Sequence, residues 1–88
     1  MDHADFRIGG EFTTPSGRWR CTDVGTRTIV AIRIDHVDAT TIADGHRITR
    51  RLSQAEAERE GWFNGPPYPV LEHVFDEDDM EECEPINA

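Results

Sequence analysis

The feature that most constrains the fold is a run of β-branched residues between Thr26 and Ile34. Valine, isoleucine and threonine have restricted side-chain rotamers in a helix, but they pack well on the surface of a pleated sheet. We therefore expect this segment to form the central strand of a β-sheet.

Two shorter strands are predicted nearer the N-terminus. Phe6 and Ile8 alternate with polar residues, and the segment from Glu11 to Thr14 has an extended pattern. Pro15 to Gly17 follows, and proline and glycine favour a tight turn because one fixes φ and the other allows positive φ. The first part of the chain is therefore expected to fold as two strands and a turn.

The segment from Arg18 to Val24 alternates in the manner of a half-buried strand. Trp19 and Cys21 fall on one face, and their polar neighbours fall on the other. The alternation fails from Asp23 to Gly25, which predicts a bulge or a turn before the β-branched run.

A protruding hairpin is predicted in the middle of the chain. Ile42 and Ile48 flank Asp44 and Gly45, and an Asp-Gly pair favours the two-residue type I′ turn of β-hairpins. The rest of the segment 35–51 has a weak pattern, so the prediction depends on the turn.

One short helix is expected after the hairpin. Ser53 and Glu56 form a capping box, good helix formers run from Gln54 to Glu60, and Gly61 is placed to end the helix in the left-handed conformation. The helix has little apolar surface of its own, so neighbouring apolar residues must anchor it.

Aromatic residues and prolines dominate the next segment, from Trp62 to Pro69, which we call the arch. Its prolines predict a rigid, extended backbone. We expect Trp62 and Phe63 to fill one end of the fold, and Tyr68 to stand exposed as a candidate contact residue. The segment from Val70 to Phe75 is predicted to be the last strand.

These elements predict a mainly β protein in which residues 1–88 form a single domain. Five or so short strands with tight turns, in so small a chain, favour an antiparallel sheet that closes on itself. The prediction is a small SH3-like antiparallel β-barrel, or a strongly bent sheet, with one short helix. The alternative is an α+β fold in which the helix covers an open sheet.

Negative charge is concentrated at the C-terminal end. The sequence has 18 acidic and 9 basic residues, and 7 of the acids lie between Asp76 and Glu84. The other 11 acids nearly balance the 9 bases, so the acidic segment 76–88 carries most of the net charge of −9. Carboxylates at this density repel one another and attract basic surfaces. We expect those nearest the last strand, Asp76 to Asp79, to be the best fixed in position.

The same charge argues against several classes of partner. Direct binding of nucleic acid is not expected, because it requires cationic side chains that neutralise phosphates. The sequence contains no apolar stretch long enough to cross a bilayer and no signal-peptide pattern, so we expect no membrane partner and a cytoplasmic location. Cys21 and Cys83 lack metal-binding or redox spacing and are predicted to be free thiols.

No catalytic residue, metal or cofactor is predicted. Asp76 and Asp78 are expected to share a strand face, but the glycine of a calcium-binding loop is missing. The histidines and cysteines do not have the spacing of zinc ligands. Asp35, His36 and Asp38 include an acid and a base, yet neighbouring residues on a strand point to opposite faces.

Two segments carry a resemblance to other proteins. They are CTDVGTRTIVAIRID, from Cys21 to Asp35, and GWFNGPPYPVLEHVFDEDDMEEC, from Gly61 to Cys83. In these two segments, and in their order along the chain, the sequence resembles a group of short bacterial and phage-associated proteins. The resemblance implies no particular activity, and it does not extend to the segment 36–51.

Two hypotheses about function remain open from the sequence. The first is a non-enzymatic protein that docks on a basic surface of a protein partner, for example as an inhibitor, carried by a mobile element, of a defence complex that handles nucleic acid. Its candidate contact residues are the acids Asp76, Glu77, Asp78, Asp79, Glu81 and Glu82. The second is a regulatory interaction module that uses the arch, with Tyr68 as its contact residue and the acids serving solubility alone.

Overall fold

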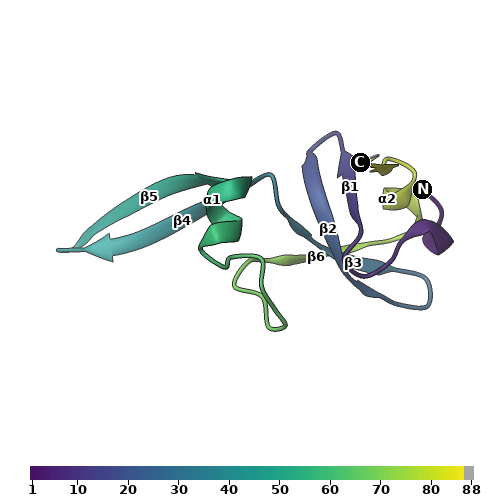
Figure 1. Ribbon diagram of the computed structural model, residues 1–88, viewed down its shortest axis with the longest axis horizontal. Coiled ribbons are helices and arrows are strands. Elements are labelled where there is room, and N and C mark those ends of the chain that lie inside the picture. The colour runs from purple at the N-terminus through teal and green to yellow at the C-terminus, as the bar shows by residue number, and fades with distance from the viewer. Residues whose placement is uncertain (87–88) are drawn as a thin grey trace.

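The computed structural model describes residues 1–86 as two antiparallel β-sheets with short helices (Figure 1). The elements, in chain order, are η1 (His3–Asp5), β1 (Glu11–Thr14), β2 (Gly17–Val24), β3 (Ile29–Arg33), β4 (His36–Ala43), β5 (His46–Ser53), α1 (Gln54–Arg59), β6 (Glu72–Phe75), α2 (Glu77–Met80) and β7 (Glu84–Pro85). Strands make up 45% of the structure and helices 15%, which confirms the mainly β prediction.

The larger sheet has the strand order β6-β3-β2-β1-β7, and all of its neighbouring strands are antiparallel. The predicted central strand, β3, is paired on both sides, although β2 is the middle strand of the five described. A register shift between Cys21 and Asp23 marks an irregularity inside β2, just before the break predicted from Asp23 to Gly25. Within residues 1–86 the sheet is open, because β6 and β7 do not pair with each other. The closed SH3-like barrel is therefore not formed.

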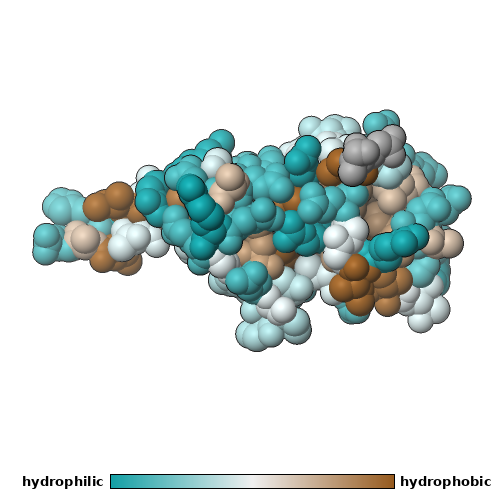
Figure 2. All heavy atoms as spheres, in the orientation of Figure 1, coloured by the Kyte–Doolittle hydropathy of each residue, from teal (hydrophilic) through white to brown (hydrophobic). Residues whose placement is uncertain are grey.

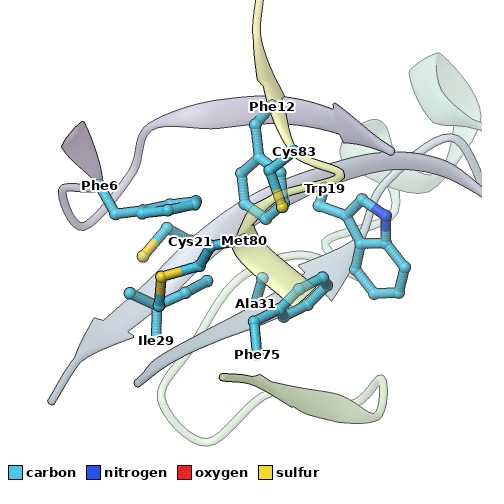
Figure 3. Close-up of a cluster of buried hydrophobic side chains, with 9 residues drawn as sticks. All are labelled: Phe6, Phe12, Trp19, Cys21, Ile29, Ala31, Phe75, Met80 and Cys83. Carbon is cyan, nitrogen blue, oxygen red and sulfur yellow. The ribbon is translucent and has the colours of Figure 1, made fainter. Parts of the chain in front are cut away.

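One face of this sheet carries the larger hydrophobic cluster (Figure 3). Its buried side chains are Phe6, Phe12, Trp19, Cys21, Ile29, Ala31, Phe75, Met80 and Cys83. Phe75 packs edge to face against both Phe12 and Trp19, with ring centroids 5.5 and 5.0 Å apart, an arrangement that the quadrupoles of aromatic rings favour. Trp19 and Cys21 both point inward, as their alternation predicts.

A second cluster lies on the opposite face of β3. Ile29 and Ala31 belong to the first cluster, whereas Ile32 and Ile34 belong to the second. The other buried members of the second cluster are Val37, Leu52, Ala57 and Phe63. The β-branched run is thus buried on both faces, which explains its uninterrupted apolar character.

The predicted hairpin is confirmed and is longer than its turn signal alone indicates. Strands β4 and β5 pair only with each other among the described residues, from His36 opposite Ser53 to Ala43 opposite His46. Asp44 and Gly45 have φ values of 50° and 74°, and positive φ at both central residues is what a type I′ turn requires. The hairpin projects along the longest dimension of the molecule, 48 Å (Figure 1).

The predicted helix is also present, as α1. The hydroxyl of Ser53 accepts a hydrogen bond from the backbone N–H of Glu56 at 3.2 Å, and the Glu56 carboxylate accepts one from the N–H of Ser53. Gly61 follows the helix with a φ of 82°, in the left-handed region. Anchorage comes from Ala57 and Phe63, which are buried against the root of the hairpin.

Three predicted strand boundaries are wrong. The central strand, predicted from Thr26 to Ile34, spans only Ile29–Arg33 as β3. Phe6 and Ile8 do not form a strand; Phe6 is buried in the core, and Ile8 lies in a turn with its side chain exposed. The last strand begins at Glu72 instead of Val70, since the ladder with β3 begins where Glu72 faces Ile32. In each case long-range pairing, which local alternation does not encode, sets the boundary.

Candidate interaction site at the acidic end

The acidic end, residues 76–84, begins with a short helix that the sequence did not predict. Strand β6 stops at Phe75, and Asp76 is the N-cap of α2. Asp76 Oδ1 accepts a hydrogen bond from the backbone N of Asp79 at 2.9 Å, and Asp79 Oδ2 accepts one from the N of Asp76 at 3.0 Å. This reciprocal capping holds the pKa of the Asp76 carboxyl below its usual value. The prediction that Asp76 and Asp78 share a strand face is therefore wrong.

The acidic end is anchored to the core by apolar side chains. Met80, on α2, and Cys83, just after it, are both buried in the larger hydrophobic cluster (Figure 3). The amino group of Met1 donates hydrogen bonds to the carbonyl oxygens of Met80 at 2.8 Å and Cys83 at 3.1 Å. A positive group at the C-terminal end of a helix is favourable because the carbonyls there carry partial negative charge.

An ion pair ties the start of α2 to the β2–β3 turn. Arg27 Nε donates to Glu77 Oε1 at 2.9 Å, and this hydrogen bond raises the pKa of Arg27. The pair borders an open hollow of about 660 Å³. Its lining residues are Thr26, Arg27, Thr28, Asp76, Glu77 and Asp78. The structure thus brings the turn between β2 and β3 next to the start of the acidic end.

The six candidate acids fall into three kinds. Asp76 and Asp79 cap the helix, and Glu77 binds Arg27. The other three are exposed and make no side-chain hydrogen bond or ion pair within residues 1–86; they are Asp78, Glu81 and Glu82. The carboxylates that hydrogen bonds hold in position are therefore not the ones that are free to bind a partner. Charge density alone does not show this difference.

Tyr68, the remaining candidate, lies away from the acids. Its side chain is half-buried and packs against the second hydrophobic cluster, whereas the acidic end is anchored in the first. Phe63 is buried and Trp62 half-buried in the same region, so both fill space at the root of the hairpin. The prediction of an exposed Tyr68 is only half right.

The Asp35, His36 and Asp38 cluster is closer than its strand pattern indicates. His36 Nδ1 lies 3.2 Å from Asp35 Oδ2, and His36 Nε2 lies 4.0 Å from Asp38 Oδ2. Asp35 precedes β4, so the alternation of strand faces does not apply to it. A hydrogen bond from Arg51 lowers the pKa of Asp38. His36 and Asp38 line a hollow of about 370 Å³ whose lining includes no serine, threonine or cysteine as a nucleophile.

Both cysteines are buried and have a structural role in the core. They are free thiols, and burial raises the pKa of Cys21 and of Cys83. Because the thiolate is the reactive form, a raised pKa and an apolar environment make each thiol inert at neutral pH. In the part of the chain that the structure describes, no three histidine, cysteine, aspartate or glutamate side chains converge as a metal site.

Comparison with known proteins adds no family assignment. No family model, no curated protein and no solved structure matches the chain. None of the helices in residues 1–86 has the length and apolar character needed to cross a bilayer. Function must therefore be argued from the surface of this molecule.

Proposed function

We propose that the protein is a non-enzymatic binding protein whose acidic end docks on a basic surface of a protein partner. The observation that carries the proposal is the placement of Asp78, Glu81 and Glu82 on a folded segment, exposed and without partners within residues 1–86. Met80 and Cys83 hold the same segment in the core. The carboxylates are thus presented from a fixed backbone.

Fixed presentation matters because binding must overcome the entropy of ordering both surfaces. A disordered acidic tail loses backbone freedom when it docks, whereas the acidic end has already lost most of it on folding. Carboxylates accept charge-assisted hydrogen bonds from arginine and lysine, which are shorter and stronger than neutral ones. The concentrated charge also accelerates encounter with a basic surface.

The chemistry of the acidic end narrows the class of partner. Closely spaced carboxylates occupy the same arginine and lysine side chains that hold a phosphate backbone. We propose that the partner is a protein that handles nucleic acid, and that docking competes with its nucleic acid. An inhibitor of a defence complex, carried by a mobile element, is the specific form of this proposal.

The arch supports a second candidate. Trp62, Pro69 and Val70 line the smaller hollow, and Leu71 beside them is 79% exposed. Apolar groups at the edge of a hollow are typical of a contact surface. In this alternative the arch, including Tyr68, makes the contact and the acids serve solubility. Tyr68→Ala then abolishes binding to the partner, and added salt has little effect.

The acidic-end proposal is tested first with an arginine-rich synthetic peptide as probe. Peptide is titrated into isotopically labelled protein, and backbone amide shifts are followed by NMR. We expect the largest shifts at residues 77–84, and several-fold weaker binding for the Glu81→Gln, Glu82→Gln double variant. The matched control is Asp23→Asn, Glu72→Gln, which changes the net charge equally at exposed acids outside the acidic end and the hairpin, and keeps an oxygen at position 72 to accept the hydrogen bond from Thr22.

The same three proteins, together with Tyr68→Ala, are then used to capture partners from the source cell at low and high salt, and the captured proteins are identified by mass spectrometry. A partner retained by wild type and by the control variant, but lost from the double variant and at high salt, supports the proposal. If both double variants lose binding equally, net charge and not the acidic end is responsible. If both double variants retain the partner and Tyr68→Ala loses it, the arch and not the acidic end makes the contact.

A further inference from the structure

The β4–β5 hairpin projects from the opposite end of the molecule to the acidic end, and the proposed function does not use it (Figure 1). Its root is buried through Val37 and Leu52. Beyond the root, every residue from Thr40 to Arg51 is exposed. An isolated two-stranded ribbon is at best marginally stable in water, so a long uncovered one is a feature that needs an explanation.

The outer part of the hairpin is a regular ribbon. Its ladder runs without a register shift to the Ala43 and His46 pair, where the Asp44-Gly45 turn closes it. Thr40 Oγ1 lies 3.3 Å from Thr49 Oγ1 across the ladder. The side chains near the tip are therefore presented in a defined alternation, one face after the other.

This alternation places one large apolar side chain on each face of the tip. Ile48 shares the face of Leu52, and Ile42 lies on the other face, opposite Arg47. Ile42 is 73% exposed and Ile48 is 54% exposed. Figure 2 shows apolar side chains among hydrophilic ones on the projecting hairpin. A flat surface can cover only one face of a ribbon, so burial of both isoleucines requires an occupant that encloses the tip.

Charge defines the chemistry of that occupant. Residues 39–51 include three arginines and one aspartate, in contrast to the acidic end. Arg50 pairs with Glu60 and Arg51 with Asp38, while Arg47 has no hydrogen-bond or ion-pair partner within residues 1–86. Arg47 sits beside the exposed Ile42 and is free to pair with a carboxylate.

We propose that the hairpin is a second contact surface, which inserts its tip into an apolar cleft of a protein partner with carboxylates at the mouth of the cleft. Ile42 and Ile48 pack against the two walls, and Arg47 pairs with a carboxylate at the rim. A nucleic-acid groove fits less well, because two of the three arginines are already paired and each face carries an isoleucine that no phosphate or base edge requires.

The test uses the two faces separately. A photo-crosslinking amino acid is placed at position 42 or 48 of the full chain in the source cell, and crosslinked products are identified by mass spectrometry. Position 8 is the matched control, since Ile8 is 66% exposed on the body of the protein. We expect the same protein at positions 42 and 48 and not at position 8. The partner protein identified at positions 42 and 48 is then purified, and its affinity is measured for wild type, Ile42→Asn, Ile48→Asn and Arg47→Glu.

Each hairpin variant is expected to bind roughly tenfold more weakly or worse, as truncation of a buried anchor does, while Arg47→Lys restores part of the loss. Circular dichroism on each variant checks that the fold is intact. The proposal is overturned if crosslinks form at one face only, at neither face, to nucleic acid or to a second copy of this chain. Unchanged affinity in both isoleucine variants overturns it as well. We expect the Glu81→Gln, Glu82→Gln variant to leave hairpin crosslinking unchanged, so failure of this proposal can be told apart from failure of the acidic-end proposal.

Discussion

The acidic end and the β4–β5 hairpin are both charged and exposed, yet they are ordered by different means. The acidic end depends on partners far away in the sequence: Met80 and Cys83 enter the core, and Glu77 binds Arg27 across 50 residues. The hairpin depends on its own ladder and turn, with burial only at its root. The carboxylates are therefore presented only while the larger cluster is intact, whereas the hairpin's tip is held by its own ladder and turn beyond a buried root.

The largest expected effect is at the anchor of the acidic end. Met80→Ala removes a fully buried side chain and leaves a cavity, which costs about 2–5 kcal/mol of unfolding free energy. Met80→Leu preserves volume, and a loss below about 1.5 kcal/mol is expected. Chemical denaturation followed by fluorescence measures both. Equal and small losses in the two variants would mean that the acidic end does not depend on this contact.

The helix cap is expected to have a smaller effect, visible in the pH dependence. Capping lowers the pKa of Asp76 in the folded state, so its contribution to stability is present above the unfolded pKa of about 4 and is lost as the pH falls through the folded value. Asp76→Asn keeps a capping oxygen that does not titrate. Its stability should therefore fall less than that of wild type between about pH 6 and pH 3.

Denaturation at several pH values compares the two proteins. The other carboxyls with lowered pKa values, Asp35, Asp38 and Glu56, are present in both and cancel in the difference. Parallel pH profiles would show that the cap does not contribute. Asp76→Ala, which removes the capping oxygen, should be less stable than both at neutral pH.

The parts of the fold that sequence predicted are those set by neighbouring residues. The Asp44-Gly45 turn and the Ser53-Glu56 capping box each act within four positions, and both are present. Closure of the sheet is set by long-range pairing of its edges, and here β6 and β7 remain unpaired with each other within residues 1–86. The turn signals in the sequence predicted several short strands, but they do not show whether the edges of the sheet pair to close a barrel.

The candidate site shows the same division. A dense run of carboxylates predicted where negative charge lies, but it gave no periodic helix signal, because α2 is a single turn with no apolar periodicity. Asp76 and Asp79 do have the spacing of a capping box, which was the available signal. Asp76 and Asp79 cap the helix and Glu77 pairs with Arg27, so three of the six candidate acids already have partners within the protein.

The ion pair between Arg27 and Glu77 is expected to matter less than the cap. Both side chains are mostly exposed, at 79% and 59%, and exposed pairs contribute little because water and salt screen them. Arg27→Gln should lower stability slightly at low salt and not at high salt. It also releases the Glu77 carboxylate, so affinity for the arginine-rich peptide should rise. A large loss of stability that persists at high salt would indicate that Arg27 does more than pair with Glu77.

The smallest effect on stability is expected at the hairpin tip. Ile42→Thr and Ile48→Thr keep a β-branched side chain suited to a strand, and neither isoleucine contacts the core, so the unfolding free energy should change by no more than about 0.5 kcal/mol. Leu52→Ala, at the root of the same strand and on the same face as Ile48, should cost about 2–5 kcal/mol because Leu52 is fully buried. Denaturation of all three variants separates tip from root.

A loss of more than about 1 kcal/mol at the tip would mean that the isoleucines are covered by the protein itself, and the contrast between a core-dependent acidic end and a self-supporting hairpin would fail. A null effect on stability combined with a loss of partner binding would show that the isoleucines serve recognition instead of folding.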